Sequence, residues 1–382
     1  MSLRPQTRGR PRASRLLGLA ALGAAFVIAV AGCSSSSATT APSAAPATQA
    51  PATATPATQA PATAGPAESA APSASTLACP PPSSPVAATL ILDYLPNAVH
   101  VPIYNALAKG FYKDAGIDLK IETPTSTSDT IKLMAAGKAD FGITSMLDFL
   151  TTFQQDPSIR IFSAVEQSPL GSIVGFQKSG VTRPKDLEGK LVGVTGVPSD
   201  LAALNSIVAY DGGDPTKVEN ITIGFNAVQN VVSGAVQAAI GFWNSEGVQL
   251  QAMEPTFIFR LDEFGAPTYP ELVMFSRNEY LDKNACLTQA FVDATAKGYE
   301  DMVADPAAAL QTLIDATQGL ALNETKAQLE VLMPVFKGDA PAYGHVNMDA
   351  LQAYLDWAKK AQILDMSNPP TDFATDQFTA AQ

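Results

Sequence analysis

From Val86 to about Tyr280, short apolar or β-branched runs alternate with segments of helical periodicity. Strict alternation of this kind is typical of layered α/β folds with mostly parallel sheets. After Tyr280 the pattern is helical almost to the end. The expected strands are 89–93, 117–121, 141–144, 159–165, 172–177, 191–194 and 239–243, and the expected helices are 129–136, 145–154, 287–302, 307–316, 324–332 and 348–361.

Two similar apolar strands, 172–177 and 271–276, follow prolines and bracket roughly 100 residues that have their own alternation. Such strands are typical of a hinge between two lobes, although two ordinary strands of one sheet would give the same pattern. We expect hinge residues near Gln177 and Ser276. The expected division is a first lobe over 86–172, a second lobe over 173–274, and a return to the first lobe with C-terminal helices over 275–382.

The residues before Val86 cannot form a core. The stretch from Ser34 to Pro85 is almost entirely Ala, Pro, Thr and Ser, with one charge, Glu68, and it repeats a five-residue unit that begins with proline. Because this composition has almost no apolar surface to bury and proline favours extended backbone, it predicts a semi-rigid tether.

Ahead of the tether, five arginines precede the apolar run Leu16–Ala31, which is short for a membrane span and typical of a signal peptide. The run ends in Val30-Ala-Gly-Cys33, which resembles the lipobox of bacterial lipoproteins. We therefore expect residues 1–32 to be removed and residues 33–85 to form a tether whose first residue, Cys33, carries the lipid. A plain signal peptide that happens to carry a cysteine is the alternative.

The charge balance limits the partners. The chain contains 24 Lys and Arg against 36 Asp and Glu, and loss of 1–32 would remove five arginines and leave a net charge near −17. A surface of this sign repels nucleic acid and anionic headgroups. We expect no nucleic-acid partner and a membrane contact through the lipid only.

The sequence does not indicate an enzyme. It contains no CxxC, HExxH, GxSxG or Walker motif, and two histidines cannot supply a rich metal site. We expect no catalytic residue, no metal and no cofactor. A purely structural adhesion lipoprotein would explain the tether but not the polar and aromatic residues described below. Besides Cys33 there are only Cys79 and Cys286, which we expect to pair in an oxidising compartment; two free thiols are the alternative.

Polar side chains follow the expected strands, where α/β sheets place their ligand-contacting loops. Tyr94, Asn97 and His100 follow the first strand. Asn97 offers a donor and an acceptor to a heterocycle edge, but asparagine also caps helices, and the two roles are compatible. A single histidine such as His100 is more often packed than in contact with a ligand.

Two further strand ends carry candidates. Ser145 and Met146 follow the strand 141–144, where Ser145 is also suited to cap the next helix. Thr195 and Gly196 lie in the loop 193–199, whose amides could hold a phosphate or carbonyl oxygen, although the loop is neither a P-loop nor a complete GxGxxG.

The segment 241–246 is the most specific candidate, because it places Phe242, Trp243, Asn244 and Glu246 within one turn after an apolar strand. Aromatic rings stack on flat ligands, and a carboxylate accepts from an exocyclic amino group. A core tryptophan and a glutamate that starts a helix would give the same residues.

Several segments in order, 92–100, 106–119, 135–143 and 186–194, resemble periplasmic binding proteins for thiamine pyrimidine precursors, riboflavin, sulfonates, nitrate and taurine. The resemblance covers nearly all of the chain after Val86. It implies a type II periplasmic-binding-protein fold with two α/β lobes. It also implies an extracytoplasmic monomer that serves an ABC permease and its ATPase.

The element Tyr269-Pro-Glu-Leu-Val273, with Asn97 and His100, is similar to the thiamine-precursor and riboflavin branch, which adds Tyr269 to the expected site and favours a contact for His100. In thiamine-precursor proteins an aromatic residue and a glutamate four positions later hold the aminopyrimidine. Phe242 and Glu246 match that spacing. Fungal enzymes that synthesise the pyrimidine share the fold, but their cysteine-rich motif is absent here.

The resemblance leaves several ligands open, and charge discriminates among them. None of the strand-end segments that carry the candidate site residues contains Arg or Lys, which disfavours sulfonate, nitrate and taurine as ligands. We expect a flat nitrogen heterocycle, an aminopyrimidine thiamine precursor ahead of riboflavin, because the dioxo edge of riboflavin would face Glu246 with two carbonyl acceptors.

Overall fold

The computed structural model describes residues 79–80 and 84–379. The expected signal peptide, the lipid attachment at Cys33 and the tether as far as residue 78 lie outside the described residues. No helix within the described ranges is long and apolar enough to cross a membrane.

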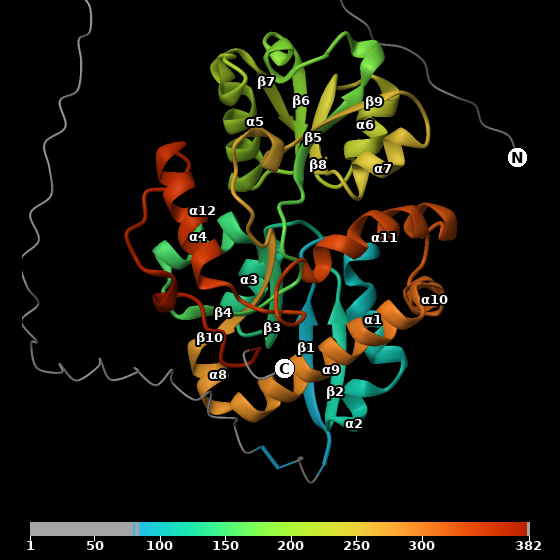
Figure 1. The fold of residues 1–382 in the computed structure, drawn as a ribbon, viewed down its shortest axis with the longest axis vertical. Helices are drawn as coiled ribbons and strands as arrows, with labels where there is room; N and C mark the ends of the chain where they lie inside the picture. Colours follow the sequence, from blue (N-terminus) through green and yellow to red (C-terminus); the bar gives the residue numbers. More distant parts are fainter. Residues whose placement is uncertain (1–78, 81–83, 380–382) are drawn as a thin grey trace, which may run out of the picture. The chain divides into compact units, whose positions relative to one another are not determined.

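The first of two sheets has the strand order β2-β1-β3-β10-β4 (Figure 1). Its strands are β1 Val86–Ile91, β2 Ile117–Glu122, β3 Phe141–Ser145, β4 Ile159–Ala164 and β10 Leu272–Arg277. β1 pairs in parallel with β2 and β3, whereas β10 is antiparallel to both of its neighbours. One strand, β10, therefore runs against the rest of its sheet.

The second sheet has the order β7-β6-β8-β5-β9 and the same design (Figure 1). Its strands are β5 Gly171–Phe176, β6 Leu191–Val194, β7 Glu219–Thr222, β8 Ala238–Phe242 and β9 Thr256–Arg260. Here β5 is the strand that is antiparallel to both neighbours. The predicted α/β class with two lobes is confirmed, and each sheet is mixed because of its one reversed strand.

Helices cover both sheets, and the last part of the chain is helical as predicted (Figure 1). They are α1 Val101–Ala108, α2 Phe111–Asp114, α3 Asp129–Ala135, α4 Met146–Gln155, α5 Pro198–Tyr210, α6 Ala227–Ser233, α7 Glu246–Gln251, α8 Asn278–Lys283, α9 Ala285–Ala304, α10 Pro306–Ala316, α11 Leu322–Lys337 and α12 Met348–Lys360.

The long helix α9 packs closely against α1, and a glycine makes this possible. A Cβ atom on Gly298 would lie 2.2 Å from the carbonyl oxygen of Pro102, so no larger residue fits. Asn105 of α1 donates from Nδ2 to the carbonyl of Gly298 at 2.9 Å. The ring of Phe291 on α9 stacks on that of Phe141 in β3, with centroids 4.4 Å apart, which joins the helix to the buried centre of the first sheet.

The chain crosses between the two sheets twice. Residues 165–170 lead from β4 into β5, and residues 265–271 lead from the short 3₁₀ helix Leu261–Phe264 into β10. The reversed strands β5 and β10 are thus the two that the sequence singled out for a hinge. The crossings precede them, however, so the expected hinge positions Gln177 and Ser276 lie beyond the crossings, and the expected boundaries at 172 and 274 fall inside strands.

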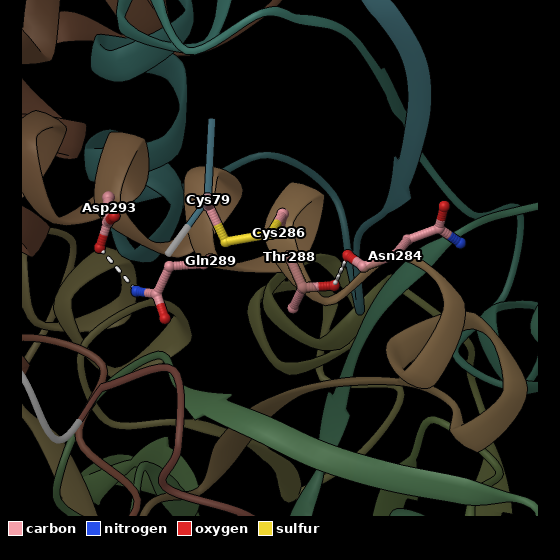
Figure 2. The surroundings of a disulfide bond; sticks show 6 residues. All are labelled: Cys79, Asn284, Cys286, Thr288, Gln289 and Asp293. Carbon is pink, nitrogen blue, oxygen red and sulfur yellow. Dashed lines mark hydrogen bonds between the residues drawn. A yellow bond between two sulfur atoms is a disulfide. The ribbon is translucent and has the colours of Figure 1, made fainter. Parts of the chain in front are cut away.

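A disulfide joins the first described residue to α9. Cys79 is bonded to Cys286, 207 positions later in the sequence, with the two Cα atoms 5.2 Å apart (Figure 2). Near the bond, Thr288 Oγ1 donates to the carbonyl of Asn284 at 3.1 Å and so bonds back within the start of the helix. The N-terminal edge of the described chain is therefore attached covalently to a C-terminal helix, as the sequence predicted.

Candidate functional site

A cleft lies between the carboxyl ends of strands from both sheets, with an empty volume of about 970 Å³ that includes its open mouth. The expected residues that line it are Tyr94, Asn97, Ser145, Thr195, Phe242, Glu246 and Tyr269. Polar residues that the sequence did not single out also line it, namely Asp93, Thr127, Thr144, Asp148, Ser199, Asp200, Ser245, Glu271, Tyr354 and Trp357.

The loop after β1 is organised by His100, which does not line the cleft. His100 is fully buried, and its Nδ1 accepts from the backbone N–H of Asn97 at 3.2 Å. Its Nε2 therefore carries the proton and donates to Oδ1 of Asp93 at 2.9 Å. His100 was expected to contact a ligand, but here its ring holds a loop whose other residues Asp93 and Asn97 line the cleft.

Asn97 has the capping role that the sequence left open, and it also lies in the cleft lining. Its Oδ1 accepts from the backbone N–H of Val99 at 3.0 Å, which caps the short 3₁₀ helix Ala98–His100, and its Nδ2 donates to the carbonyl of Leu95 at 3.1 Å. The residue nevertheless lines the cleft. Its side-chain bonds hold it in one orientation at the cleft wall.

Glu246 and Phe242 come from the second sheet. Glu246 begins α7, and its Oε2 accepts from the backbone N–H of Phe242 at 2.9 Å. This folded-back position depends on Gly241, where a Cβ atom would lie 3.0 Å from the Glu246 side chain. Burial raises the pKa of Glu246, and its hydrogen bonds oppose that shift.

Tyr94 meets Glu246 from the first lobe. Its ring packs edge-on against Phe225 of the second lobe, with centroids 4.3 Å apart. Burial raises the pKa of Tyr94, and the hydrogen bond and charge of the Glu246 carboxylate raise it further. The hydroxyl of Tyr94 therefore keeps its proton and donates a hydrogen bond to Glu246, across the two lobes.

Trp243 and Asn244 lie behind the cleft wall. Trp243 donates from Nε1 to the carbonyl of Pro169 at 2.9 Å, and the guanidinium of Arg260 lies 4.2 Å from its ring centroid. Asn244 is fully buried, and in the described part of the chain neither polar atom of its side chain has a hydrogen-bond partner. Neither residue lines the cleft, although both were expected to contact a ligand, and the indole of Trp243 points to the first chain crossing through its bond to Pro169.

The first turn of α4 joins the lobes. Ser145 caps α4 as expected, and its Oγ donates to Oδ2 of Asp148 at 2.7 Å. Ser199, in the first turn of α5, donates from Oγ to the same Oδ2 at 2.9 Å and from its backbone N–H to Oδ1 at 3.3 Å. Met146 is fully buried in the core and does not line the cleft, contrary to expectation.

The loop before α5 uses its donors internally. The hydroxyl of Thr195 and the backbone N–H of Gly196 both donate to Oδ2 of Asp200 at 2.8 Å. Gly196, which has a φ of +109°, does not line the cleft, and its N–H, which was expected to hold a ligand oxygen, is bonded to Asp200 instead. Thr195 remains in the wall, where burial raises the pKa of the neighbouring Asp200.

An aromatic row forms the opposite wall. The ring of Tyr269 lies 4.4 Å from that of Tyr354, which lies 5.6 Å from that of Trp357, both on α12. The hydroxyl of Tyr269 donates to Oε2 of Glu271 at 3.1 Å. The sequence predicted the helix at α12 but not its place in the site, because a tyrosine and a tryptophan three positions apart also suit an ordinary buried helix face.

The lining has a consistent charge. It contains five carboxylates and no Lys, Arg or His. Burial raises the pKa of four of them, Asp148, Asp200, Glu246 and Glu271. Among the described residues no group of His, Cys, Asp and Glu could hold a metal ion. This arrangement suits a flat ligand that donates hydrogen bonds and carries no negative charge.

Comparison with known proteins gives a consistent picture. A family model described as NMT1/THI5 like matches residues 97–309. A formylaminopyrimidine-binding protein of Halalkalibacterium halodurans is 28% identical over 274 residues, which cover 70% of this chain and 83% of that protein. A 4-amino-5-hydroxymethyl-2-methylpyrimidine phosphate synthase of Saccharomyces cerevisiae is 25% identical over 239 residues, 59% of this chain and 70% of the synthase.

Among solved structures, an alkanesulfonate-binding protein from Xanthomonas axonopodis pv. citri superposes with a TM-score of 0.61 at 14% identity. The match covers 77% of this chain and 99% of the other. At this identity the likeness concerns the fold alone, which is the two-lobed fold of periplasmic binding proteins.

Proposed function

This chain belongs to the NMT1/THI5-like family, and from that premise we propose that it is an extracytoplasmic solute-binding protein for an aminopyrimidine. One observation carries the proposal. The cleft between the lobes has aromatic walls and five carboxylates but no basic residue. A neutral or protonated heterocycle with amino donors matches such a cleft, and an anion does not.

In the proposed complex the ring lies between Phe242 of the second lobe and the aromatic side chains of the first. Glu246 accepts from the exocyclic amino group, and its Oε2 is already held in place by the N–H of Phe242 at 2.9 Å. The hydroxyl of Tyr94, which comes from the other lobe, supplies the polar contact that Phe242 lacks. Asn97 reads the remaining edge of the ring from a fixed orientation.

The charge of the cleft and the hydrogen-bonding groups of each ligand rank the alternative ligands. Sulfonate, nitrate and taurine would place an anionic group among five carboxylates without a basic residue in the lining. Riboflavin would stack on the same aromatic walls, but its two carbonyl acceptors would face Glu246. The formylaminopyrimidine-binding relative supports the pyrimidine over both.

Binding is favoured over catalysis, although the same family includes pyrimidine phosphate synthases. The cleft lining contains neither histidine nor cysteine, and Cys79 is bonded to Cys286 of α9. The buried carboxylates and hydroxyls of the lining hydrogen-bond to one another, so they are held in fixed positions that suit binding of a ligand. A synthase function therefore has less support than a binding function in transport.

The proposed context is delivery to an importer. A lipid on Cys33 would hold the protein to the outer face of the membrane, and the Ala/Pro/Thr tract would let the lobes reach an ABC permease and its ATPase. The extended tract could span on the order of 150 Å at most. We propose that the protein acts as a monomer and needs no cofactor.

The deciding experiment is identification of the ligand that copurifies. Protein purified gently from its own host is denatured, and the released small molecules are analysed by mass spectrometry. An aminopyrimidine present in stoichiometric amount is the expected result. A released flavin, or an alkanesulfonate that rebinds to the refolded protein, would replace the pyrimidine assignment.

A further inference from the structure

The two chain crossings between the lobes each contain a buried glutamate. Glu166, in the crossing 165–170, is fully buried, and Glu271, in the crossing 265–271, is nearly so. A buried carboxylate is costly unless its oxygens accept hydrogen bonds. Their hydrogen-bond partners therefore show what the two residues do.

Each carboxylate binds the backbone of the other crossing. Oε1 of Glu166 accepts from the N–H of Leu272, at the end of the second crossing, at 2.9 Å. Oε2 of Glu271 accepts from the N–H groups of Leu170 and Gly171, at the end of the first crossing, at 3.3 and 3.2 Å. The two glutamates thus form a reciprocal clamp across the paired crossings, reinforced by the N–H of Val165, which donates to the carbonyl of Leu272 at 3.0 Å.

Glu271 also lines the ligand cleft, together with Tyr269 and Gly171. The hydroxyl of Tyr269 donates to the same Oε2 that binds the first crossing. The backbone carbonyl of Glu271 accepts from the N–H of Met146 at 2.7 Å, at the start of α4, two residues before Asp148, which bonds across to Ser199. One residue is therefore in contact with the cleft, with both crossings and with the helix that bridges the lobes.

The clamp does not use all of its bonding capacity. In the part of the chain that the structure describes, Oε2 of Glu166 has no hydrogen-bond partner, and neither has the buried hydroxyl of Tyr343. Burial and the nearby Glu271 raise the pKa of Glu166. A clamp built only for stability would satisfy both oxygens. Incomplete satisfaction suits an element that must also open.

We propose that Glu271, with Glu166 as its counterpart, is a positioning residue that couples occupation of the cleft to closure of the lobes. The inference rests on the proposed binding function. Glu271 holds the two crossings in the arrangement in which Asp148 reaches Ser199 and Tyr94 reaches Glu246. Removing its acceptor oxygens leaves the N–H groups of Leu170 and Gly171 buried without partners, so the open arrangement, where water reaches them, becomes favoured.

The test measures lobe separation directly in the full chain. Spin labels are attached through non-canonical residues at Lys113 and Glu219, which are exposed on α2 and β7. The distance between the labels is measured by pulsed electron paramagnetic resonance. Wild type, Glu271→Leu and Glu271→Gln are compared with and without 4-amino-5-hydroxymethyl-2-methylpyrimidine. The matched control is Glu263→Leu, which removes an exposed carboxylate from the 3₁₀ helix just before the second crossing.

We expect Glu271→Leu to lose most of its short-distance population in the ligand-free state and to bind the pyrimidine about tenfold more weakly. Glu271→Gln keeps an acceptor oxygen and should recover most of both quantities, and Glu263→Leu should match wild type. A Glu271→Leu distance distribution identical to wild type would overturn the proposal.

Two further outcomes are separated by design. If wild type ignores the pyrimidine, the proposed ligand is wrong, but the ligand-free distances still decide whether Glu271 controls closure. If Glu271→Leu does not fold, Tyr269→Phe replaces it, because it removes the hydroxyl that donates to Oε2 of Glu271 at 3.1 Å. A partial loss of the short distance supports the proposal, and an unchanged distribution contradicts it.

Discussion

Asp148 of the first lobe accepts two hydrogen bonds from Ser199 of the second, one from the hydroxyl at 2.9 Å and one from the backbone N–H at 3.3 Å. The carboxylate is nearly fully buried, and burial raises its pKa. Both partners line the cleft and come from different lobes, so we expect the contact to break when the lobes separate. It joins the first turns of α4 and α5 directly.

Ser199→Ala removes one of the two bonds and leaves the backbone bond in place. We expect the pyrimidine to bind roughly three- to tenfold more weakly, with most of the change in the dissociation rate, because a closing contact slows release. Stopped-flow fluorescence measures both rates. Ser206→Ala, which removes a hydroxyl that donates to the carbonyl of Ala203 within the same helix, should change neither rate. Equal effects from the two variants would assign the loss to helix stability.

Glu246→Gln keeps the shape of the side chain and removes its charge. We expect aminopyrimidine binding to weaken by about 1.5–3 kcal/mol if the amino group donates to a charged acceptor. Quenching of tryptophan fluorescence follows binding, since Trp357 lines the cleft and Trp243 does not. Glu254→Gln, at an exposed site beyond α7, is the control. Tight riboflavin binding by the wild type, or an unchanged affinity in Glu246→Gln, would refute the ligand assignment.

Stability should depend on pH in a defined sense. Burial raises the pKa of Asp148, Glu166, Asp200, Glu246 and Glu271, so their contribution to stability is complete below the ordinary carboxyl pKa and is lost as pH rises through the raised values. Carboxyls with a lowered pKa, such as that of the partly buried Asp211 beside Arg183, act in the opposite sense at lower pH.

The ligand-free protein should therefore melt at a higher temperature near pH 5 than near pH 8. Glu166→Gln should make this dependence shallower, because it removes a buried ionisable group and keeps an acceptor for Leu272. Calorimetry across that range, with Glu263→Gln as the exposed control, measures the effect. A melting temperature that rises between pH 5 and pH 8 would contradict the prediction.

The Cys79–Cys286 bond closes a loop over 207 positions, which contains the strands of both sheets. In the chain-entropy model its removal costs up to about 5 kcal/mol. We expect Cys79→Ser/Cys286→Ser to unfold at a lower urea concentration, with binding at low temperature retained because the bond lies on α9, away from the cleft. Quantitative labelling of both thiols in the unreduced, denatured wild type would show that the bond does not form.

Anchoring by Cys33 is tested by fractionation. Cys33→Ser should prevent lipid attachment, so the protein should either remain uncleaved or be shed into the medium. Detergent partitioning and intact mass measure the outcome, and Cys286→Ser should stay in the detergent phase. Equal membrane retention of the Cys33→Ser protein would remove the lipoprotein proposal.

Local patterns determined which elements form and in what order. The predicted strands 117–121, 141–144 and 191–194 match β2, β3 and β6 to within a residue or so, because alternation and apolar runs are properties of neighbouring residues. The edge strands β7 and β9 were not expected. All four residues of β7 are exposed, so no buried face marked it.

The sequence also found the loops that line the cleft, since strand ends meet at one edge of each sheet. It could not decide which side chain of a loop faces the ligand. His100 and Trp243 are polar or aromatic, as are side chains that line the cleft, such as Tyr94 and Phe242. Yet His100 bonds to its own loop, and Trp243 bonds to the first chain crossing.

Only the tertiary structure brings distant segments into the site. Trp357 on α12, Glu271 in the second crossing and the Asp148–Ser199 contact between the lobes carry no local signal of their role. Their function depends on how two sheets are placed across two reversed strands. That placement is set by long-range packing and by carboxylates that bind backbone across a hundred residues of sequence, which no periodicity encodes.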